Sequence, residues 1–143
     1  MDFVNDLAFG LLSGLAYAAV GLVLLAVGYA AIDLITPGRL GQLIYVERNA
    51  NAAAVVASGL VAIATIVTTA ILTSHDELGR GLASAGGFGL LGVVLLVLSF
   101  LVVDRLTPGD LGDICTDDRR HPAVLVTVAN YLAVGAIVAA AIS

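Results

Sequence analysis

Two aspartates, Asp33 and Asp104, stand at the start of two copies of one motif and are the residues whose spacing first suggests chemistry. Each is followed by two residues and then by Thr-Pro-Gly, and the copies are 71 residues apart. Each copy closes a long apolar segment, so its aspartate is expected in the last turn of a helix, at the negative end of the helix dipole. Such a carboxylate needs a specific partner. The motif residues are Asp33, Thr36, Pro37, Gly38, Asp104, Thr107, Pro108 and Gly109.

Two kinds of partner for these carboxylates are open. One is the set of free N–H groups at the start of the helices expected to begin at Pro37 and Pro108. The other is the pair Arg48 and Arg119, which follow the two motifs at matching places. In the simpler interpretation, which we favour, each aspartate braces a tight turn. In the functional one, the two aspartates face each other and form an acidic entry site for a cation.

The composition indicates a membrane protein. Hydrophobic residues make up 60% of the 143 residues and charged residues only 12%, against about 25% charged in a soluble domain. Four apolar stretches are each long enough to cross a bilayer, which takes about 20 residues, and they leave no room for a soluble catalytic domain. The chain has no Lys and no basic run, which argues against nucleic acid as a partner. The expected spans are 9–32, 52–72, 82–103 and 123–142.

The motif repeat predicts an all-α integral membrane protein built as two parallel two-helix repeats, residues 1–72 and 73–143, within one membrane domain. We expect a pseudo-two-fold axis along the membrane normal to relate the repeats. Each motif should also open a short interfacial helix. In the first repeat this helix is expected from Pro37 to Tyr45, with Thr36 as its N-cap.

The distribution of arginine predicts the orientation. Five of the six arginines lie in the two motif-bearing links, and only Arg80 lies in the link on the opposite side. Under the positive-inside rule, both Thr-Pro-Gly loops are cytoplasmic and both termini are outside. The N-terminus carries Asp2 and Asp6 and no basic residue, so the first apolar segment is expected to be a retained span rather than a signal peptide.

Small residues at four-residue spacing predict close helix packing. They form one stripe on the first span and a matching stripe on the third, and such residues allow the backbones of membrane helices to approach each other. The stripes could pack against each other within the chain, or leave one free for a second protomer. Their residues are Gly10, Gly14, Ala18, Gly81, Ala85 and Gly89.

No residue pattern indicates catalysis, a cofactor or a metal. The spacing of the acids with Cys115 and His121 in the second link fits neither a zinc nor a calcium pattern, and Cys115 is expected to pack as a small apolar residue. The segment His75-Asp76-Glu77 is interpreted as a polar turn. The second-link residues of this set are Asp110, Asp113, Cys115, Asp117, Asp118 and His121.

With its doubled Asp-x-x-Thr-Pro-Gly-x-Leu signature over four spans, the chain resembles the domain-of-unknown-function family three-fifty, small proteins of the bacterial cytoplasmic (inner) membrane. The resemblance covers essentially the whole chain. It implies a multi-pass protein made of two repeats, and it implies no reaction. Members are often reported near polyamine- or peptide-ligase-like genes.

The leading functional hypothesis is a non-enzymatic membrane module in the lipid bilayer that forms a homo-oligomer or assembles with a partner membrane protein. It depends on the small-residue stripes and on the absence of charged residues near the middle of any span. The alternative is a small channel or carrier for a cation such as a polyamine, with Asp33 and Asp104 at its entrance.

Overall fold

The computed structural model describes residues 2–74, 78–107, 109–117, 119 and 121–143, and these residues form four long helices, two short helices and no strand. The prediction of an all-α fold with four helices long and apolar enough to cross a membrane is confirmed. The long helices are α1 (Asp2–Ile35), α3 (Ala50–Leu72), α4 (Leu78–Leu106) and α6 (Pro122–Ile142), and the short ones are α2 (Leu40–Tyr45) and α5 (Leu111–Thr116).

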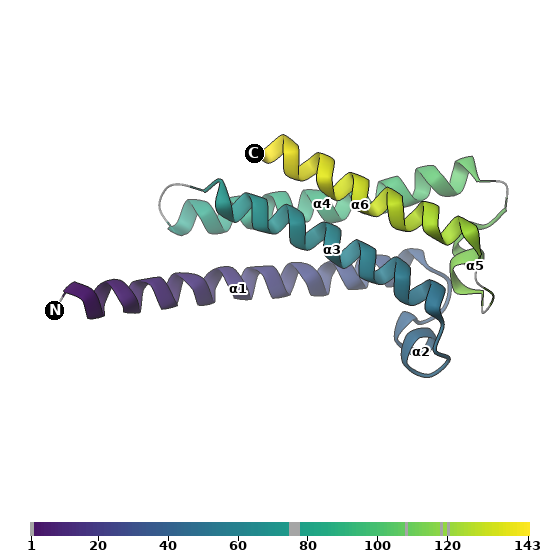
Figure 1. Cartoon of the computed structure of the whole chain (residues 1–143), viewed down its shortest axis with the longest axis horizontal. Helices are drawn as coiled ribbons and strands as arrows, with labels where there is room; N and C mark the ends of the chain where they lie inside the picture. The colour runs from purple at the N-terminus through teal and green to yellow at the C-terminus, as the bar shows by residue number, and fades with distance from the viewer. Residues whose placement is uncertain (1, 75–77, 108, 118, 120) are drawn as a thin grey trace.

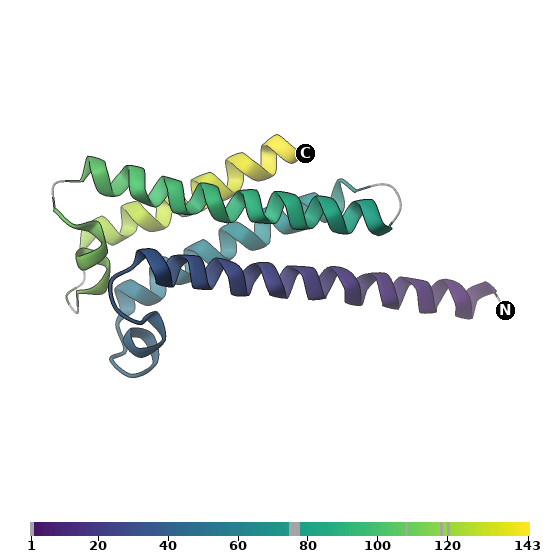
Figure 2. The same cartoon turned by 180° about the vertical axis from the view of Figure 1, so that it is seen from behind.

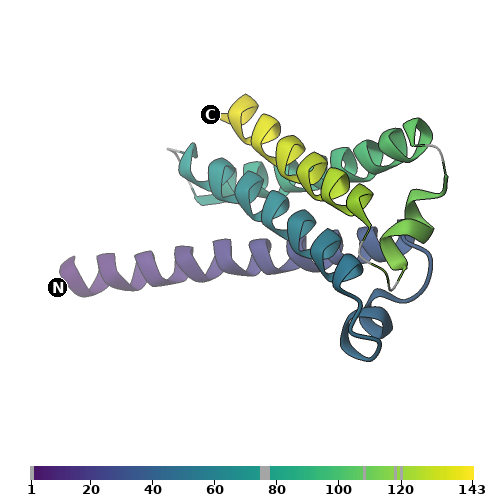
Figure 3. The same cartoon turned by 45° about the vertical axis from the view of Figure 1, so that its right-hand side comes forward.

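The long helices run alternately up and down, so that α2 and α5 lie at one end of the bundle and both chain termini point toward the other (Figure 1). Figure 2 shows α1 and α4 side by side from behind, and Figure 3 shows both short helices at the right-hand end of the bundle. Both Thr-Pro-Gly motifs, which directly precede the short helices, are therefore at the same end of the molecule.

Helix α3 is the centre of the bundle, since it packs against α1, α4 and α6. Half of the most apolar stretch of α3 is buried, compared with 17% of the corresponding stretch of α1. Helix α4 also packs against α1 and α6, whereas α1 and α6 stand at opposite corners without an extended contact. The expected pseudo-two-fold would pair α1 with α6 wherever it pairs α3 with α4. The helix contacts therefore do not follow a closed two-fold.

The side chains that touch across α1 and α4 give the physical reason. Tyr17 lies over Gly81 and Leu24 lies over Gly89, so facing residues are 64 and 65 positions apart rather than the 71 of the sequence repeat. At 1.5 Å per residue, the two helices are slid by roughly 10 Å from the register that a two-fold would impose.

Glycines set how closely the helices approach. A β-carbon added at Gly92 of α4 would lie 2.5 Å from Ile66 Cδ1 of α3, and one added at Gly135 of α6 would lie 2.7 Å from Ala62 Cβ and 2.8 Å from Ala62 Cα. Lipid removes the hydrophobic drive for helices to associate, so close backbone packing of this kind takes its place. The tightest backbone approach at a glycine is between α3 and α6.

Helix α1 extends well past the other helices at its N-terminal end (Figure 1). Apart from Asn5 and Asp6, this part carries mostly apolar side chains that nothing covers, with Phe3 77% and Phe9 73% exposed. At 34 residues, α1 is about 50 Å long, against a hydrocarbon thickness of about 30 Å. A large apolar surface is thus left without a partner in the chain.

We predict that Gly135→Ala lowers the melting temperature of the purified protein in detergent. The new methyl group meets the backbone of Ala62, and overpacking of this kind costs about 1–3 kcal/mol, more than the gain of about 1 kcal/mol in helix propensity. Gly87→Ala is the matched control, because a β-carbon there meets nothing within 4 Å. A melting temperature equally unaffected in both variants would contradict the packing role of Gly135.

Candidate functional site: the paired motifs at the loop end

Asp33, in the last turn of α1, caps the helix that follows it. Its Oδ1 accepts a hydrogen bond of 2.8 Å from the backbone N–H of Leu40, the first residue of α2. The N–H groups in the first turn of a helix have no partner within the helix, and the dipole favours negative charge there. A carboxylate that sits at the unfavourable end of α1 therefore lies at the favourable end of α2.

Asp104 makes the same contact in the second half of the chain. Its Oδ1 accepts from the backbone N–H of Leu111 at 2.8 Å, and Leu111 begins α5. Here a second carboxylate joins in, because Asp110 Oδ1 accepts from Gly112 N at 3.0 Å and from Asp113 N at 3.3 Å. The corresponding residue of the first half, Arg39, supplies no side-chain cap.

The Thr-Pro-Gly residues end one helix and turn the chain before the next. Thr36 Oγ1 donates to Ile32 O, and Thr107 Oγ1 donates to Val103 O, both at 2.8 Å, so each threonine closes the helix that precedes it. Gly38 then takes φ +94°, which a residue with a side chain rarely adopts. The expectation that Thr36 caps a helix starting at Pro37 is therefore wrong, since the left-handed Gly38 delays α2 until Leu40.

Gly109 repeats this conformation at the second motif, with φ +121°. Pro108, between Thr107 and Gly109, lies outside the described residues. A left-handed glycine thus directly follows the Thr-Pro pair in both copies.

Arg48 and Arg119 do not take the place of these backbone partners. Within the described part of the chain, neither forms an ion pair with Asp33 or Asp104. Both arginines are exposed, and Arg48 has a left-handed φ of +56°. Of the two kinds of partner that the sequence left open, the geometry favours the backbone N–H groups.

The two motifs meet at a shared hollow. Pro37 of the first motif lies against Gly112 of α5, where an added β-carbon would be 2.7 Å from Pro37 Cδ. Beside this contact is a hollow of about 350 Å³ whose lining includes Thr36, Asp104 and Asp110. Asp33 does not line it, so the hollow has one aspartate of the motif pair together with Asp110, rather than Asp33 facing Asp104.

Two asparagines at the start of α3 hold the link after α5, and sequence analysis did not assign them a role. Asn49 Nδ2 donates to Thr116 O at 2.7 Å and to Asp117 O at 3.1 Å. Asn51 Nδ2 donates to Asp117 O at 2.9 Å and to Arg119 O at 2.8 Å. The motif repeat gave no signal for them, because the residues 71 positions later are Arg and Pro. The sequence feature that could have indicated their role is the Asn-x-Asn pattern at the start of a span.

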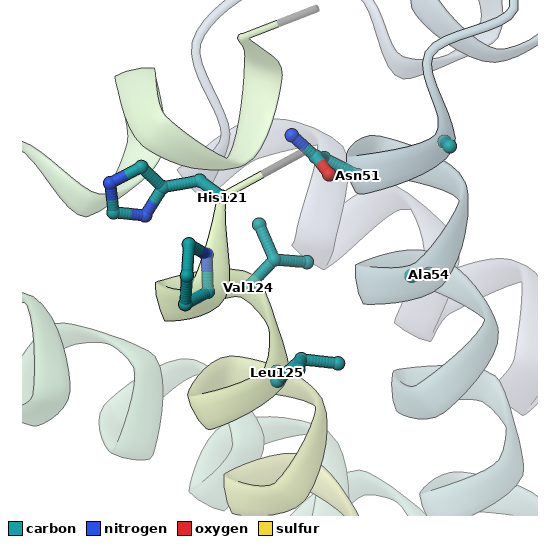
Figure 4. Close-up of a pocket in the computed structure, with 7 residues that line it drawn as sticks. Asn51, Ala54, His121, Val124 and Leu125 are labelled. Carbon is teal, nitrogen blue, oxygen red and sulfur yellow. The ribbon is translucent and has the colours of Figure 1, made fainter. Parts of the chain in front are cut away.

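A second hollow, of about 440 Å³, lies between the starts of α3 and α6, next to Asn51 and His121 (Figure 4). His121 Nδ1 accepts a hydrogen bond of 3.2 Å from Ala123 N, so this side chain caps α6. In Figure 4 its ring extends away from α3. The lining near Ala54, Val124 and Leu125 is mostly apolar.

The remaining residues of the second link are spread apart. Cys115 is fully buried against Thr127, with Sγ 3.8 Å from Oγ1, and this burial raises the pKa of the thiol. Asp117 Oδ1 accepts from Arg119 N. Among the described residues, no three His, Cys, Asp or Glu side chains come together as a metal site. Asp118 and the segment His75-Asp76-Glu77 lie outside the described residues.

The two small-residue stripes have different environments. On α4, Gly81, Ala85 and Gly89 are buried, with Tyr17 and Leu24 of α1 lying over the two glycines.

On α1, β-carbons added at Gly10 or Gly14 would meet nothing within 4 Å, and Ala18 is exposed. Only the second stripe is therefore covered by the chain itself.

Four helices long and apolar enough to cross a membrane make this chain a multi-pass membrane protein. It belongs to the family described as Domain of Unknown Function (DUF350), which matches residues 6–142. This match confirms the resemblance to that family.

Curated relatives are transmembrane proteins of bacteria. A UPF0719 transmembrane protein of Mycolicibacterium paratuberculosis is 36% identical over 140 residues, which cover 98% of this chain and 93% of the relative. UPF0719 transmembrane proteins of Mycobacterium bovis and Mycobacterium tuberculosis are each 32% identical over 140 residues, or 98% of this chain and 92% of theirs. No solved structure matches the chain.

We predict that Asp104→Ala exposes the backbone N–H of Leu111 and loosens α5. Removal of a capping carboxylate costs about 0.5–2 kcal/mol, so hydrogen exchange at Leu111 should become faster by roughly two- to thirty-fold. Asp113→Ala is the matched control, because it removes an exposed acid of α5 whose side chain caps no N–H among the described residues. Equal protection of Leu111 in both variants would argue against the cap.

Proposed function

We propose that this protein is a non-enzymatic membrane module that assembles with itself or with a partner membrane protein. The observation that carries the proposal is the unfilled stripe of Gly10, Gly14 and Ala18 on α1. Its counterpart on α4 is covered by side chains of α1. Exposed glycines at four-residue spacing give lipid tails little to pack against, whereas another helix can approach them closely.

The long free part of α1 supports the same proposal. Figure 1 shows the N-terminal end of this helix extending past the bundle. In the first third of the helix, Phe3, Leu7 and Leu11 each have more than half of their surface exposed. A second protein would cover this surface and the glycine stripe together. Lipid alone would cover only the side chains.

The polar groups at the loop end support a role without catalysis. Asp33, Asp104 and Asp110 accept hydrogen bonds from the backbone, and Asn49 and Asn51 donate to it. His121 accepts a backbone N–H. These side chains cap the starts of helices and hold the links between them, which are structural roles.

We place the protein in the bacterial cytoplasmic membrane, with the α2 and α5 end in the cytoplasm and both termini outside. The positive-inside rule supports this orientation. Arg39, Arg48, Arg105 and Arg119 belong to the end that carries the short helices, and Arg80 belongs to the other end.

We predict that the protein is oligomeric, or bound to a partner, in native-lipid nanodiscs, and that Gly10→Leu with Gly14→Leu shifts it to the free monomer. The leucines fill the stripe through which another helix would approach. Ala19→Leu is the matched control, because Ala19 is exposed and lies nine residues from Gly10, half a turn around the helix. Subunit counting by single-molecule photobleaching, together with crosslinking in the membrane, measures the state. A wild-type protein that is strictly monomeric and crosslinks to nothing would overturn the proposal.

A second candidate function, a pathway for a cation such as a polyamine, is favoured by the hollow between the motifs. Asp104 and Asp110 both line it. Each uses Oδ1 to cap α5, which leaves the other carboxylate oxygen for a positively charged group. The hollow would then be the entrance, and the cation would compete with the surrounding water for these oxygens.

We predict that, if this pathway exists, Asp104→Asn with Asp110→Asn abolishes polyamine uptake into liposomes that contain the folded protein. The amides keep oxygen acceptors for the caps but remove both charges. Asp113→Asn, on the exposed side of α5, should leave uptake unchanged. Uptake that persists in the double variant would remove the motif hollow from the pathway.

A further inference from the structure

We propose that the assembly partner is a second copy of this chain, docked head to tail so that its α6 lies in the groove between α1 and α3. This inference rests on the proposed function, because it names the partner and the surface of the assembly. The argument starts from a groove that is empty in the single chain and from a matching groove that is filled.

The empty groove lies between the middle of α1 and the C-terminal half of α3. It has a volume of about 440 Å³, and its lining includes small residues of both helices, Ala18 and Gly21 of α1 and Ala64 of α3, together with larger side chains. Gly21 is open enough that an added β-carbon would reach only Val67 Cγ1, at 4.0 Å. The residues that define it here are Ala18, Gly21, Leu25, Ala64, Val67 and Ile71.

The filled groove lies between α4 and α6, and α3 occupies it. Ile66 of α3 reaches Gly92, and Ala62 of α3 reaches Gly135, at the 2.5 Å and 2.7 Å separations given above for an added β-carbon. Leu24 of α1 completes the contact over Gly89. In each of these contacts, a side chain of the first half occupies the space above a small residue of the second half.

The motif spacing of 71 residues relates the two grooves. It places Gly89, Gly92 and Gly135 in register with Ala18, Gly21 and Ala64, which are the small residues of the empty groove. The α1–α3 groove therefore has the same kind of floor as the groove that α3 occupies.

The same spacing identifies what would fill the empty groove. The filling residues Leu24, Ala62 and Ile66 have Leu95, Ala133 and Ile137 as their counterparts, with identical residue types.

Two of these counterparts are exposed in the single chain, and the third is half-buried. Ile137 of α6 is 68% exposed, Ala133 is exposed, and Leu95 of α4 is half-buried. Because α6 lies on the far side of α3 from the empty groove and has no extended contact with α1, it cannot fill that groove within its own chain. A second copy can supply it.

A fourth pair extends the match toward the free end of α1. Tyr17 lies over Gly81 in the chain, and their counterparts are Phe88, which is 38% exposed, and Gly10, which nothing covers. Phe88 of the second copy would lie over Gly10. The intermolecular contact would thus use the start of the small-residue stripe as well as the groove.

Such a contact is heterologous, because the surface on one copy differs from the surface on the next. Each copy would present its α1–α3 groove to one neighbour and its α4–α6 surface to another. Repetition of a heterologous contact gives a ring if the rotation closes and an open array if it does not. It also forms between copies the extended α1–α6 contact that is absent within the described part of a single chain.

The test uses disulfide trapping in a Cys115→Ala background. One copy carries Gly21→Cys and the other Ile137→Cys, with different tags, co-expressed in one membrane and oxidised. Gly92→Cys with Ile66→Cys in one chain is the matched positive control, because it is the same pair 71 residues along in the filled groove. A disulfide forms only when β-carbons come within about 4.5 Å.

We expect a crosslinked dimer that carries both tags, and none when either single-cysteine variant is expressed alone. Ala18→Leu should reduce the crosslinked fraction at least five-fold by filling the groove, whereas Ala19→Leu should not. Efficient self-crosslinking of Gly21→Cys would instead indicate a symmetric α1–α1 contact.

That result would overturn the head-to-tail arrangement and leave self-assembly standing. Absence of the mixed dimer, with the positive control oxidised and photobleaching still counting more than one subunit, would also overturn it. Photobleaching that counts one subunit would overturn the proposed self-assembly itself.

Discussion

A carboxylate that accepts a backbone N–H at each loop-end reversal is the interaction on which the rest of the molecule depends. In and near lipid, an unpaired N–H is costly because little water is present to bond it. Asp33 and Asp104 solve this for α2 and α5, each across a span of seven residues. The short helices are then held at the foot of the bundle, where Leu40 and Leu111 are completely buried. Without these caps, the positions of α2 and α5 at the loop end would not be fixed.

Contacts at the loop end also join the two halves of the chain. Asn49 and Asn51 at the start of α3 hold carbonyls after α5, and Pro37 lies on Gly112. Along the rest of the bundle, Gly92 of α4 and Gly135 of α6 allow α3 to pack closely between these two helices. Polar contacts thus fix the register at one end, and close backbone packing maintains it through the apolar region. Because α3 takes part in both, it is the most buried of the long helices.

Much of this could be read from the sequence, and the parts that could not have physical reasons. The lengths of the apolar stretches, and the Thr-Pro-Gly residues that follow two of them, predict the four helices, because both effects are local. The start of α2 was misplaced, since the left-handed Gly38 depends on the turn as a whole. The slide of α4 along α1 depends on side chains far apart in sequence, such as Leu24 over Gly89. The repeated motif predicts a role for Asp33 and Asp104. The contacts of Asn49 and Asn51 have no counterpart in the second half of the chain, so a comparison of the repeats does not predict them.

The unequal helix lengths have a consequence for the surrounding bilayer. The uncharged stretch of α1 between Asp6 and Asp33 has 26 residues and α6 has 21, which correspond to roughly 39 and 32 Å. One edge of the protein therefore matches an ordinary hydrocarbon thickness and the opposite edge exceeds it. A hydrophobic mismatch of this kind is relieved by tilt of the long helix or by local thickening of the membrane. Because the loop end of α1 is anchored by Asp33 and α2, the deformation is concentrated at its free N-terminal end. The thickness of the apolar surface that faces lipid therefore differs between the α1 side and the α6 side of the protein.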